Sequence, residues 1–263
     1  MKIALMDSGI GLLAAAAAVR RLRPDADLVL SSDPDGMPWG PRTPADLTER
    51  ALAVARAAAA HRPDALIVAC NTATVHALDA VREELEPGIP VIGTVPAIKP
   101  AAAAGGRVAI WATPATTGSP YQRGLIRDFA TGARVTEVPC PGLADAVEAA
   151  DDDAVAAAVA AATALTPPDV TDVVLGCTHY ELVEAPIRAA LDERTRGAGY
   201  VFHGSAEPVA VQALRRLGVG PEPELSRTGG LTVLRSGREG ALPAAALAYA
   251  EGQLLVGHGA PVA

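Results

Sequence analysis

Short continuous apolar runs alternate with longer segments of helical pattern along most of the chain. The runs that predict strands are 2–6, 27–31, 65–69, 90–93, 107–112, 134–138, 172–176, 200–202 and 231–234. The segments that predict helices are 11–22, 45–60, 74–85, 121–129, 143–149, 152–165, 181–192 and 208–217, and 243–250 closes the chain. Uninterrupted apolar strands separated by helices are typical of parallel sheets buried on both faces. The pattern therefore predicts an α/β fold.

Two pairs of segments in this pattern resemble one another. Residues 64–72 and 172–179 each contain an aspartate, an apolar strand, a cysteine at its end and polar residues that open the next helix. Residues 2–8 and 107–113 are both strands that end in small polar groups. These echoes favour two similar α/β halves that place two thiols on opposite sides of one cleft. The alternative, that strand-to-helix junctions often look alike, stays open.

Length and composition limit the classes of function. The 263 residues suit one large domain or two small ones, and half of the residues are apolar but only 3% are aromatic. The core is therefore expected to be aliphatic, with the alanine-rich stretches as helices. The net charge of −8 argues against nucleic acid as a partner, because that affinity rests on Lys and Arg contacts to phosphate. A small anionic substrate stays compatible with this charge.

The three cysteines, Cys70, Cys140 and Cys177, are odd in number and show no CxxC or Cys/His ligand spacing, so neither a disulfide framework nor a structural zinc site is expected. No metal site is expected, and a reducing compartment fits. The apolar run 9–19 follows Asp7 and precedes Arg20, so it is interpreted as a turn and a helix and not as a signal peptide. No apolar stretch reaches the length of a membrane span. We expect a cytoplasmic protein without a membrane partner.

Polar residues that could carry chemistry follow several strands at their carboxyl ends, where open α/β sheets bind ligands. Cys70 and Cys177 each precede a predicted helix, whose N-terminus stabilises a thiolate and binds carboxylates. A cysteine in an apolar strand is more often an inert core residue, but two with matching polar sequels weaken that interpretation. Cys140 lies between prolines without a polar helix start, so it is expected to be structural.

Two further ionisable groups, Glu148 and His179, could orient or deprotonate a thiol. A lone glutamate on a helix is usually solvated, and a lone histidine is often a satisfied core residue. A histidine placed two residues after a cysteine at a strand end is a better candidate than most.

A dinucleotide-binding fingerprint is the competing motif. Residues 9–14 match GxGxxA, and Asp33 follows some twenty residues later. Asp7 stands at the strand end where pyrophosphate would lie, and its carboxylate would repel phosphate. The same carboxylate suits a neighbouring thiol and an amino-acid ammonium group, so the dehydrogenase hypothesis is disfavoured.

These motifs together resemble the glutamate racemases of the aspartate/glutamate racemase superfamily. The matching segments, in the family's order, are 7–11, Asp33 with 38–40, 70–74, 113–116, 141–148 and 176–179. The resemblance runs from Lys2 to about Ala210 and more weakly beyond. The two cysteine motifs together are highly specific.

The resemblance implies a fold and a set of site residues. The fold would be two α/β domains, 1–95 with 207–263 and 96–206, related by a pseudo-twofold axis with the active site in the cleft between them. Cys70 assisted by Asp7, and Cys177 assisted by Glu148 and His179, would be the acid/base pair. The residues implied to bind substrate are Ser8, Pro38, Trp39, Gly40, Asn71, Thr72, Thr113, Thr116 and Thr178.

The implied reaction is the interconversion of L- and D-glutamate without a cofactor, which supplies D-glutamate for peptidoglycan. A homodimer is compatible with the resemblance. Racemisation of another acidic amino acid, such as aspartate, is the alternative, as is a racemase-like regulatory protein without activity. The presence of both cysteines disfavours the related malonate decarboxylases, which use one thiol.

The chain departs from the family at three places. Leu12 stands where the family usually has a second glycine, Trp39 stands where it has tyrosine, and the stretch 31–37 is unusual. The larger indole is expected to narrow the substrate pocket toward aspartate or another acid. The departures bear on the identity of the substrate more than on the mechanism.

Overall fold

The computed structural model describes residues 1–103, 105–195 and 199–257. The chain forms two compact units, Met1–Val95 with Ala206–Ala263 (unit 1) and Pro96–Ser205 (unit 2). Residues 258–263, which close the C-terminal segment of the predicted first domain, lie outside the described residues.

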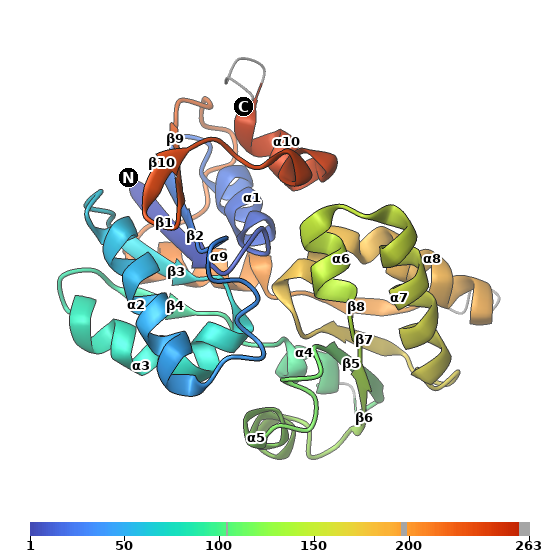
Figure 1. Cartoon of the computed structure of the whole chain (residues 1–263). Helices are drawn as coiled ribbons and strands as arrows, with labels where there is room; N and C mark the ends of the chain where they lie inside the picture. Colours follow the sequence, from blue (N-terminus) through green and yellow to red (C-terminus); the bar gives the residue numbers. More distant parts are fainter. Residues whose placement is uncertain (104, 196–198, 258–263) are drawn as a thin grey trace. The chain divides into compact units, whose positions relative to one another are not determined.

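Unit 1 is built on a sheet with the strand order β10-β9-β2-β1-β3-β4. Its strands are β1 Lys2–Asp7, β2 Asp27–Ser32, β3 Ala65–Val68, β4 Val91–Gly93, β9 Leu231–Arg235 and β10 Arg238–Gly240. Neighbouring strands pair in parallel, except β10, which is antiparallel to β9. The C-terminal segment therefore returns to extend this sheet beside β2 (Figure 1).

Helices cover both faces of this sheet. On one face, α2 (Pro44–Ala59) and α3 (Asn71–Leu85) pack on the apolar side chains of β1, β2 and β3. On the other, α1 (Leu12–Leu22) contacts β1, β2, α9 (Ala206–Arg216) and α10 (Ala250–Val256). Most of α1 is buried, and its alanines let the neighbouring elements approach closely. A strand buried on both faces is what the uninterrupted apolar runs predicted.

Unit 2 has a smaller sheet with the strand order β6-β5-β7-β8, all parallel. Its strands are β5 Arg107–Ala112, β6 Arg134–Pro139, β7 Asp172–Leu175 and β8 Val201–His203. Its helices are α4 Ile98–Ala102, α5 Pro120–Phe129, α6 Leu143–Ala149, α7 Asp152–Leu165 and α8 Glu184–Thr195. A 3-10 helix, η1 (Thr178–Val183), leads into α8, and a second, η2 (Ala244–Ala248), precedes α10 in unit 1.

The strand order of unit 2 repeats that of four consecutive strands in the sheet of unit 1. In β2-β1-β3-β4 and in β6-β5-β7-β8, the first strand of the unit lies between the second and the third. The echoing segments of the sequence thus occupy equivalent places, with β1 matching β5 and β3 matching β7. This confirms the α/β class and gives the two cysteine motifs the same position in two sheets.

Several local features were not predicted. The pattern over 181–192 indicated one helix, but the segment begins as η1 and becomes α-helical at Glu184. The short α4 and the antiparallel β10 were absent from the predicted elements, and the closing segment continues past 250 as α10. Short elements carry too few residues for a period to emerge.

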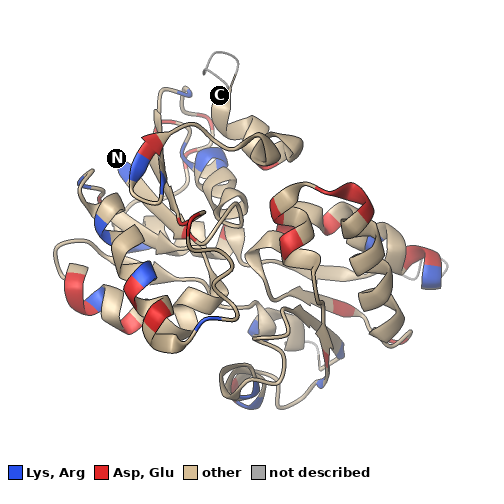
Figure 2. Ribbon diagram, in the orientation of Figure 1, with Lys and Arg blue, Asp and Glu red and all other residues tan. Residues whose placement is uncertain are grey.

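Acidic residues gather on α6 and at the start of α7, as Figure 2 shows. The residues concerned are Asp145, Glu148, Asp151, Asp152 and Asp153. Asp151 caps α7 by accepting a hydrogen bond from the backbone N–H of Ala154 at 3.0 Å. Throughout the described part of the chain, no helix combines the length and apolar character needed to cross a bilayer.

Candidate active site

Three neighbouring strands of unit 1 end side by side with polar residues. Asp7 is the last residue of β1 and pairs with Ser32, the last residue of β2. Asp33 is the next residue after Ser32. Met6 pairs with Val68 of β3, and the Ala69 N–H donates to the Met6 carbonyl at 2.8 Å. Asp7, Asp33 and Cys70 therefore lie at one edge of the sheet, as expected for the carboxyl ends of parallel strands.

Asp7 is fully buried at this edge and is held next to Ser8. The Ser8 backbone N–H donates to Asp7 Oδ1 at 2.7 Å, and the Ser8 carbonyl accepts from the N–H of Asp33 at 3.0 Å. The β1–α1 junction is thus tied to β2. A buried carboxylate beside the end of β3 can orient a thiol or bind a cation.

Cys70 occupies the N-cap position of α3, which begins at Asn71 and not at Thr74 as predicted. The thiol-bearing residue is only 7% exposed, and Asn71 is also buried, whereas Thr72 is half-buried. The first N–H groups of an α-helix lack intrahelical partners and favour negative charge. Cys70, Asn71 and Thr72 therefore lie where the N-terminus of α3 favours negative charge.

Pro38, Trp39 and Gly40 lie in the loop that joins β2 to α2. The Trp39 side chain is 1% exposed and packs in the core between the sheet, α2 and α3. Its indole Nε1 donates to Asp33 Oδ2 at 3.1 Å. The indole, which was expected to narrow a substrate pocket, thus packs in the core of unit 1 and anchors the loop that carries Pro38 and Gly40.

In unit 2, Thr113 and Thr116 are brought together in the loop after β5. The Thr113 hydroxyl donates to the Thr116 hydroxyl at 3.2 Å, and the Thr116 N–H donates to the Thr113 carbonyl at 2.9 Å. The loop is closed by Glu137, whose carboxylate accepts from the Gly118 N–H at 2.6 Å. Two hydroxyls at a strand end form a small neutral polar surface suited to a carboxylate.

Cys177, His179 and Glu148 form a chain of contacts within unit 2. Cys177 Sγ lies 3.9 Å from His179 Nδ1, and His179 Nε2 lies 3.0 Å from Glu148 Oε2. An ionised carboxylate only accepts hydrogen bonds, so Glu148 favours the tautomer with the proton on Nε2. The Nδ1 lone pair then faces the thiol. This arrangement can accept a proton from Cys177 and return it.

The elements around this group explain its geometry. Cys177 follows β7 and is the N-cap residue of η1, which carries Thr178 and His179 and is continuous with α8. Glu148 comes from α6, which packs against η1. Thr178 and His179 are buried, whereas Cys177 is partly exposed. Cys177 and Glu148 are therefore the partly exposed members of this set, and His179 is covered between them.

Cys140 differs from the other two thiols. It is 1% exposed, its Sγ lies 3.5 Å from the Val138 carbonyl, and its own carbonyl accepts from the Tyr180 hydroxyl. Burial, with a smaller effect of the nearby Cys177, raises the pKa of the Cys140 thiol to about 12. A thiol that stays protonated and covered is a poor base, which agrees with the structural role predicted for it.

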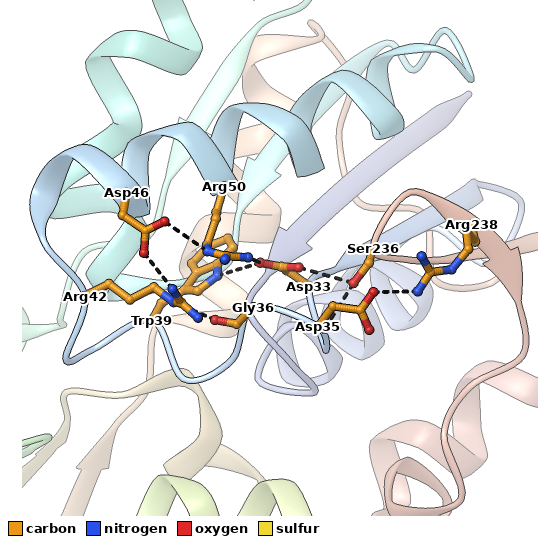
Figure 3. Close-up of polar contacts among 9 residues, drawn as sticks. All are labelled: Asp33, Asp35, Gly36, Trp39, Arg42, Asp46, Arg50, Ser236 and Arg238. Carbon is orange, nitrogen blue, oxygen red and sulfur yellow. Dashed lines mark hydrogen bonds and ion pairs between the residues drawn. The ribbon is translucent and has the colours of Figure 1, made fainter.

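The residues do not suit a dinucleotide. The Asp33 carboxylate, which would have to meet a ribose, instead binds Trp39, Arg50 and Ser236 within unit 1 (Figure 3). No group of His, Cys, Asp and Glu side chains that could hold a metal ion occurs among residues 1–103, 105–195 and 199–257.

Arg50 and Ser236 were missed by sequence reasoning. Arg50 resembles any arginine on the outer side of an amphipathic helix, and Ser236 is 203 residues from Asp33. Nothing local in the sequence signals that either contacts the loop of Trp39. The only hint is the i,i+4 spacing of Arg42, Asp46 and Arg50, which is compatible with one ion pair within α2 and a second to the residue before its N-cap.

Comparisons with known proteins add independent information. A family model described as Asp/Glu/Hydantoin racemase matches residues 11–197. A protein named glutamate racemase from a Roseiflexus species is 38% identical over 198 residues, which cover 73% of this chain and 72% of that protein.

Solved structures agree. Glutamate racemase from Escherichia coli, in complex with L-glutamate and the activator UDP-MurNAc-Ala, matches with a TM-score of 0.76 at 27% identity, covering 94% of this chain and 91% of that one. A glutamate racemase isoform from Bacillus anthracis matches with a TM-score of 0.69 at 28% identity, covering 89% and 87%.

Proposed function

Because the chain belongs to the Asp/Glu/Hydantoin racemase family, we propose that it interconverts L- and D-glutamate by a two-thiol mechanism without a cofactor. The observation that carries the proposal is the equivalence of β3 and β7, each of which is followed two residues later by a cysteine at a helix N-terminus. The names of its relatives, and the L-glutamate in the similar Escherichia coli enzyme, support the choice of substrate.

The proposed chemistry is the removal of the α-proton from one face and its replacement on the other. Cys177, oriented by His179 and Glu148, takes the α-proton of L-glutamate, while Cys70, assisted by Asp7, protonates the opposite face. The thiols exchange roles for D-glutamate. Each step is general acid–base catalysis by a positioned group, and a single thiol could not invert the centre in this way.

The α-carbanion needs stabilisation because no pyridoxal is invoked to delocalise it. Hydrogen bonds that are already oriented toward the α-carboxylate lower this barrier most. The proposed donors are the N-terminal N–H groups and neutral side chains after each strand, namely Ser8, Asn71, Thr72, Thr113, Thr116 and Thr178, with the backbone around Pro38, Trp39 and Gly40.

The biological setting is part of the proposal. D-glutamate made in the cytoplasm would enter peptidoglycan synthesis, and glutamate would be the small-molecule partner of a chain that binds neither nucleic acid nor membrane. A homodimer is the association to examine first, by light scattering on the purified protein.

A panel of L-amino acids tests the proposal. Chiral chromatography of the purified protein with L-glutamate should show D-glutamate, with no added pyridoxal phosphate, metal or nucleotide. Dependence on pyridoxal phosphate would refute the mechanism. Turnover of L-aspartate and not of L-glutamate would keep the mechanism and overturn the substrate.

A further inference from the structure

The Asp33 carboxylate is the centre of a polar network that joins three separate segments of unit 1 (Figure 3). Its Oδ2 accepts from Trp39 Nε1 at 3.1 Å and from Arg50 of α2 at 3.3 Å. Its Oδ1 accepts from the Ser236 hydroxyl, in the turn between β9 and β10, at 3.2 Å. Asp33 is 6% exposed, so these bonds are shielded from competing water.

The loop between Asp33 and Trp39 has a glycine, Gly36, where the Arg50 side chain reaches Asp33. A Cβ on Gly36 would lie 1.9 Å from Asp33 Oδ2 and 2.2 Å from an Arg50 nitrogen. The Gly36 carbonyl also accepts from Arg42 Nε at 2.7 Å, and Asp46 binds both Arg42 and Arg50. The loop backbone is thus held at α2 by these contacts, and a side chain at position 36 would displace the Asp33 carboxylate or the Arg50 guanidinium.

The third segment, the turn between β9 and β10, contacts Asp33 through Ser236, whose backbone conformation is strained. Ser236 has φ 47°, in the left-handed region, next to Gly237 with φ 76°. A positive φ is disfavoured for a residue with a Cβ, so glycine or asparagine is preferred over serine at such a turn position. The Ser236 hydroxyl donates to Asp33 and accepts from the Asp35 N–H at 3.1 Å. Strain of this kind persists where the surroundings require it and concentrates at functional positions.

We propose that Arg50 and Ser236 are positioning residues, which act through Asp33 and Trp39 to set the backbone of Trp39 and Gly40 for substrate binding. The indole is buried, so this segment contacts a ligand through its backbone, and the network fixes that backbone. The inference rests on the proposed function, in which this segment binds glutamate. It assigns a role in substrate affinity to two residues outside the acid/base groups.

Ser236→Gly separates positioning from simple stabilisation. The substitution relieves the left-handed strain and removes the hydroxyl, so the melting temperature should stay the same or rise. If Ser236 positions the loop, KM for glutamate should rise by about tenfold while kcat changes by less than about threefold. The matched control is Arg62→Gly, because Arg62 is exposed, has φ 53° and lies outside the network.

The indole of Trp39 gives a direct readout. The chain has two tryptophans, so the indole N–H region of a nitrogen-15 spectrum holds two resonances, assigned with Trp111→Phe. The Trp39 resonance should lie downfield in the wild type because its N–H donates to a carboxylate, and it should move upfield in Ser236→Gly. An unchanged resonance together with an unchanged KM would overturn the proposal.

Arg50 is tested by a graded pair. Arg50→Met keeps the length of the chain without charge, whereas Arg50→Lys keeps the charge but cannot bind Asp33 and Asp46 with separate nitrogens. KM should rise most in Arg50→Met, and Arg50→Lys should restore part of the loss. Arg56→Met, on the same helix but paired with Glu84, is the control and should leave KM unchanged. Equal KM values in all three variants would contradict a positioning role.

The two proposals fail in different ways. If the wild-type protein does not racemise glutamate, the proposed function fails, while the indole resonance still reports whether Ser236 and Arg50 hold Trp39. If the wild type racemises glutamate and the variants match it in KM and in the indole resonance, only the positioning role fails.

Discussion

The three thiols of the chain differ in their surroundings as well as in their sequence context. Cys177 is partly exposed, with a histidine at 3.9 Å, and Cys70 occupies the N-cap position of a fifteen-residue helix. Cys140 is covered and has its pKa raised to about 12 by burial. The surroundings of each thiol therefore predict that Cys70 and Cys177 take part in the reaction and that Cys140 does not.

Cys140→Ala should keep most of the turnover. The change removes a buried atom and should lower the free energy of unfolding by about 1–2 kcal/mol, without touching a proposed acid or base. Racemisation by the pure variant is measured at a temperature where circular dichroism shows it folded. Labelling by iodoacetamide at neutral pH should likewise leave Cys140 unmodified in the native wild type.

A loss of activity comparable to that of Cys70→Ala, in a variant that is still folded, would contradict the assignment. Rapid alkylation of Cys140 in the native protein would contradict the burial on which it rests.

Sequence reasoning was strongest for residues whose neighbours in space are also neighbours along the chain. Asp7, Cys70 and Cys177 were placed at strand ends because a strand and its following helix are local features. The burial of the Trp39 indole in the core of unit 1 was not foreseen, because a motif does not reveal which way a side chain faces. Arg50 and Ser236 escaped notice because their contacts with Asp33 form only after the chain has folded.

At the scale of elements, the apolar pattern located most helices and strands to within a few residues. Errors gathered at helix starts, where side chains and not periodicity decide the boundary. α3 begins at Asn71, directly after Cys70, although the pattern favoured Thr74. The difference matters because it makes Cys70 the N-cap residue itself. In unit 2, α6 and α7 begin and end where predicted, because Gly142, Ala150 and Asp151 separate them clearly.

The C-cap residue of α6, Ala150, allows a test of how the local backbone conformation affects stability. Ala150 has φ 51°, a left-handed conformation that costs an L-residue free energy and that glycine adopts readily. Ala150→Gly should therefore raise the free energy of unfolding by about 0.5–1 kcal/mol, after allowance for the greater freedom of glycine in the unfolded chain. Urea denaturation measures the change.

Ala149→Gly is the matched control, since Ala149 is the last residue of α6. It should not stabilise the protein, because glycine disfavours helical conformation. Stabilisation by both changes, or by neither, would show that the backbone conformation of Ala150 is not the cause.

The whole molecule is described best by the repetition of one sheet. Four strands of unit 1 and the four of unit 2 share one order, and the two cysteine motifs follow corresponding strands. Sequence echoes raised this hypothesis but could not separate it from the general likeness of strand-to-helix junctions. The order of strands depends on pairing between distant segments, which the sequence does not display. The comparisons confirmed the family resemblance.

The proposed use of one thiol from each half makes a prediction about isotopes. In deuterium oxide, each thiol carries solvent deuterium before turnover. The thiol that protonates the α-carbon therefore delivers deuterium, whereas the thiol that removed the proton holds it on the other face. Early in the reaction, the product enantiomer should contain deuterium at the α-carbon while recovered substrate keeps its proton. Mass spectrometry after chiral separation measures both.

Variants of the two thiols complete the argument. Cys70→Ser and Cys177→Ser should each nearly abolish racemisation, because a serine hydroxyl is a far weaker acid than a thiol. The remaining thiol should still exchange the α-proton of one enantiomer, so Cys177→Ser should favour exchange into D-glutamate and Cys70→Ser into L-glutamate. The opposite outcome would be that wild-type protein places deuterium in recovered substrate as fast as in product. That result would indicate that a single base acts on both faces of the α-carbon, and it would contradict the use of one thiol from each half.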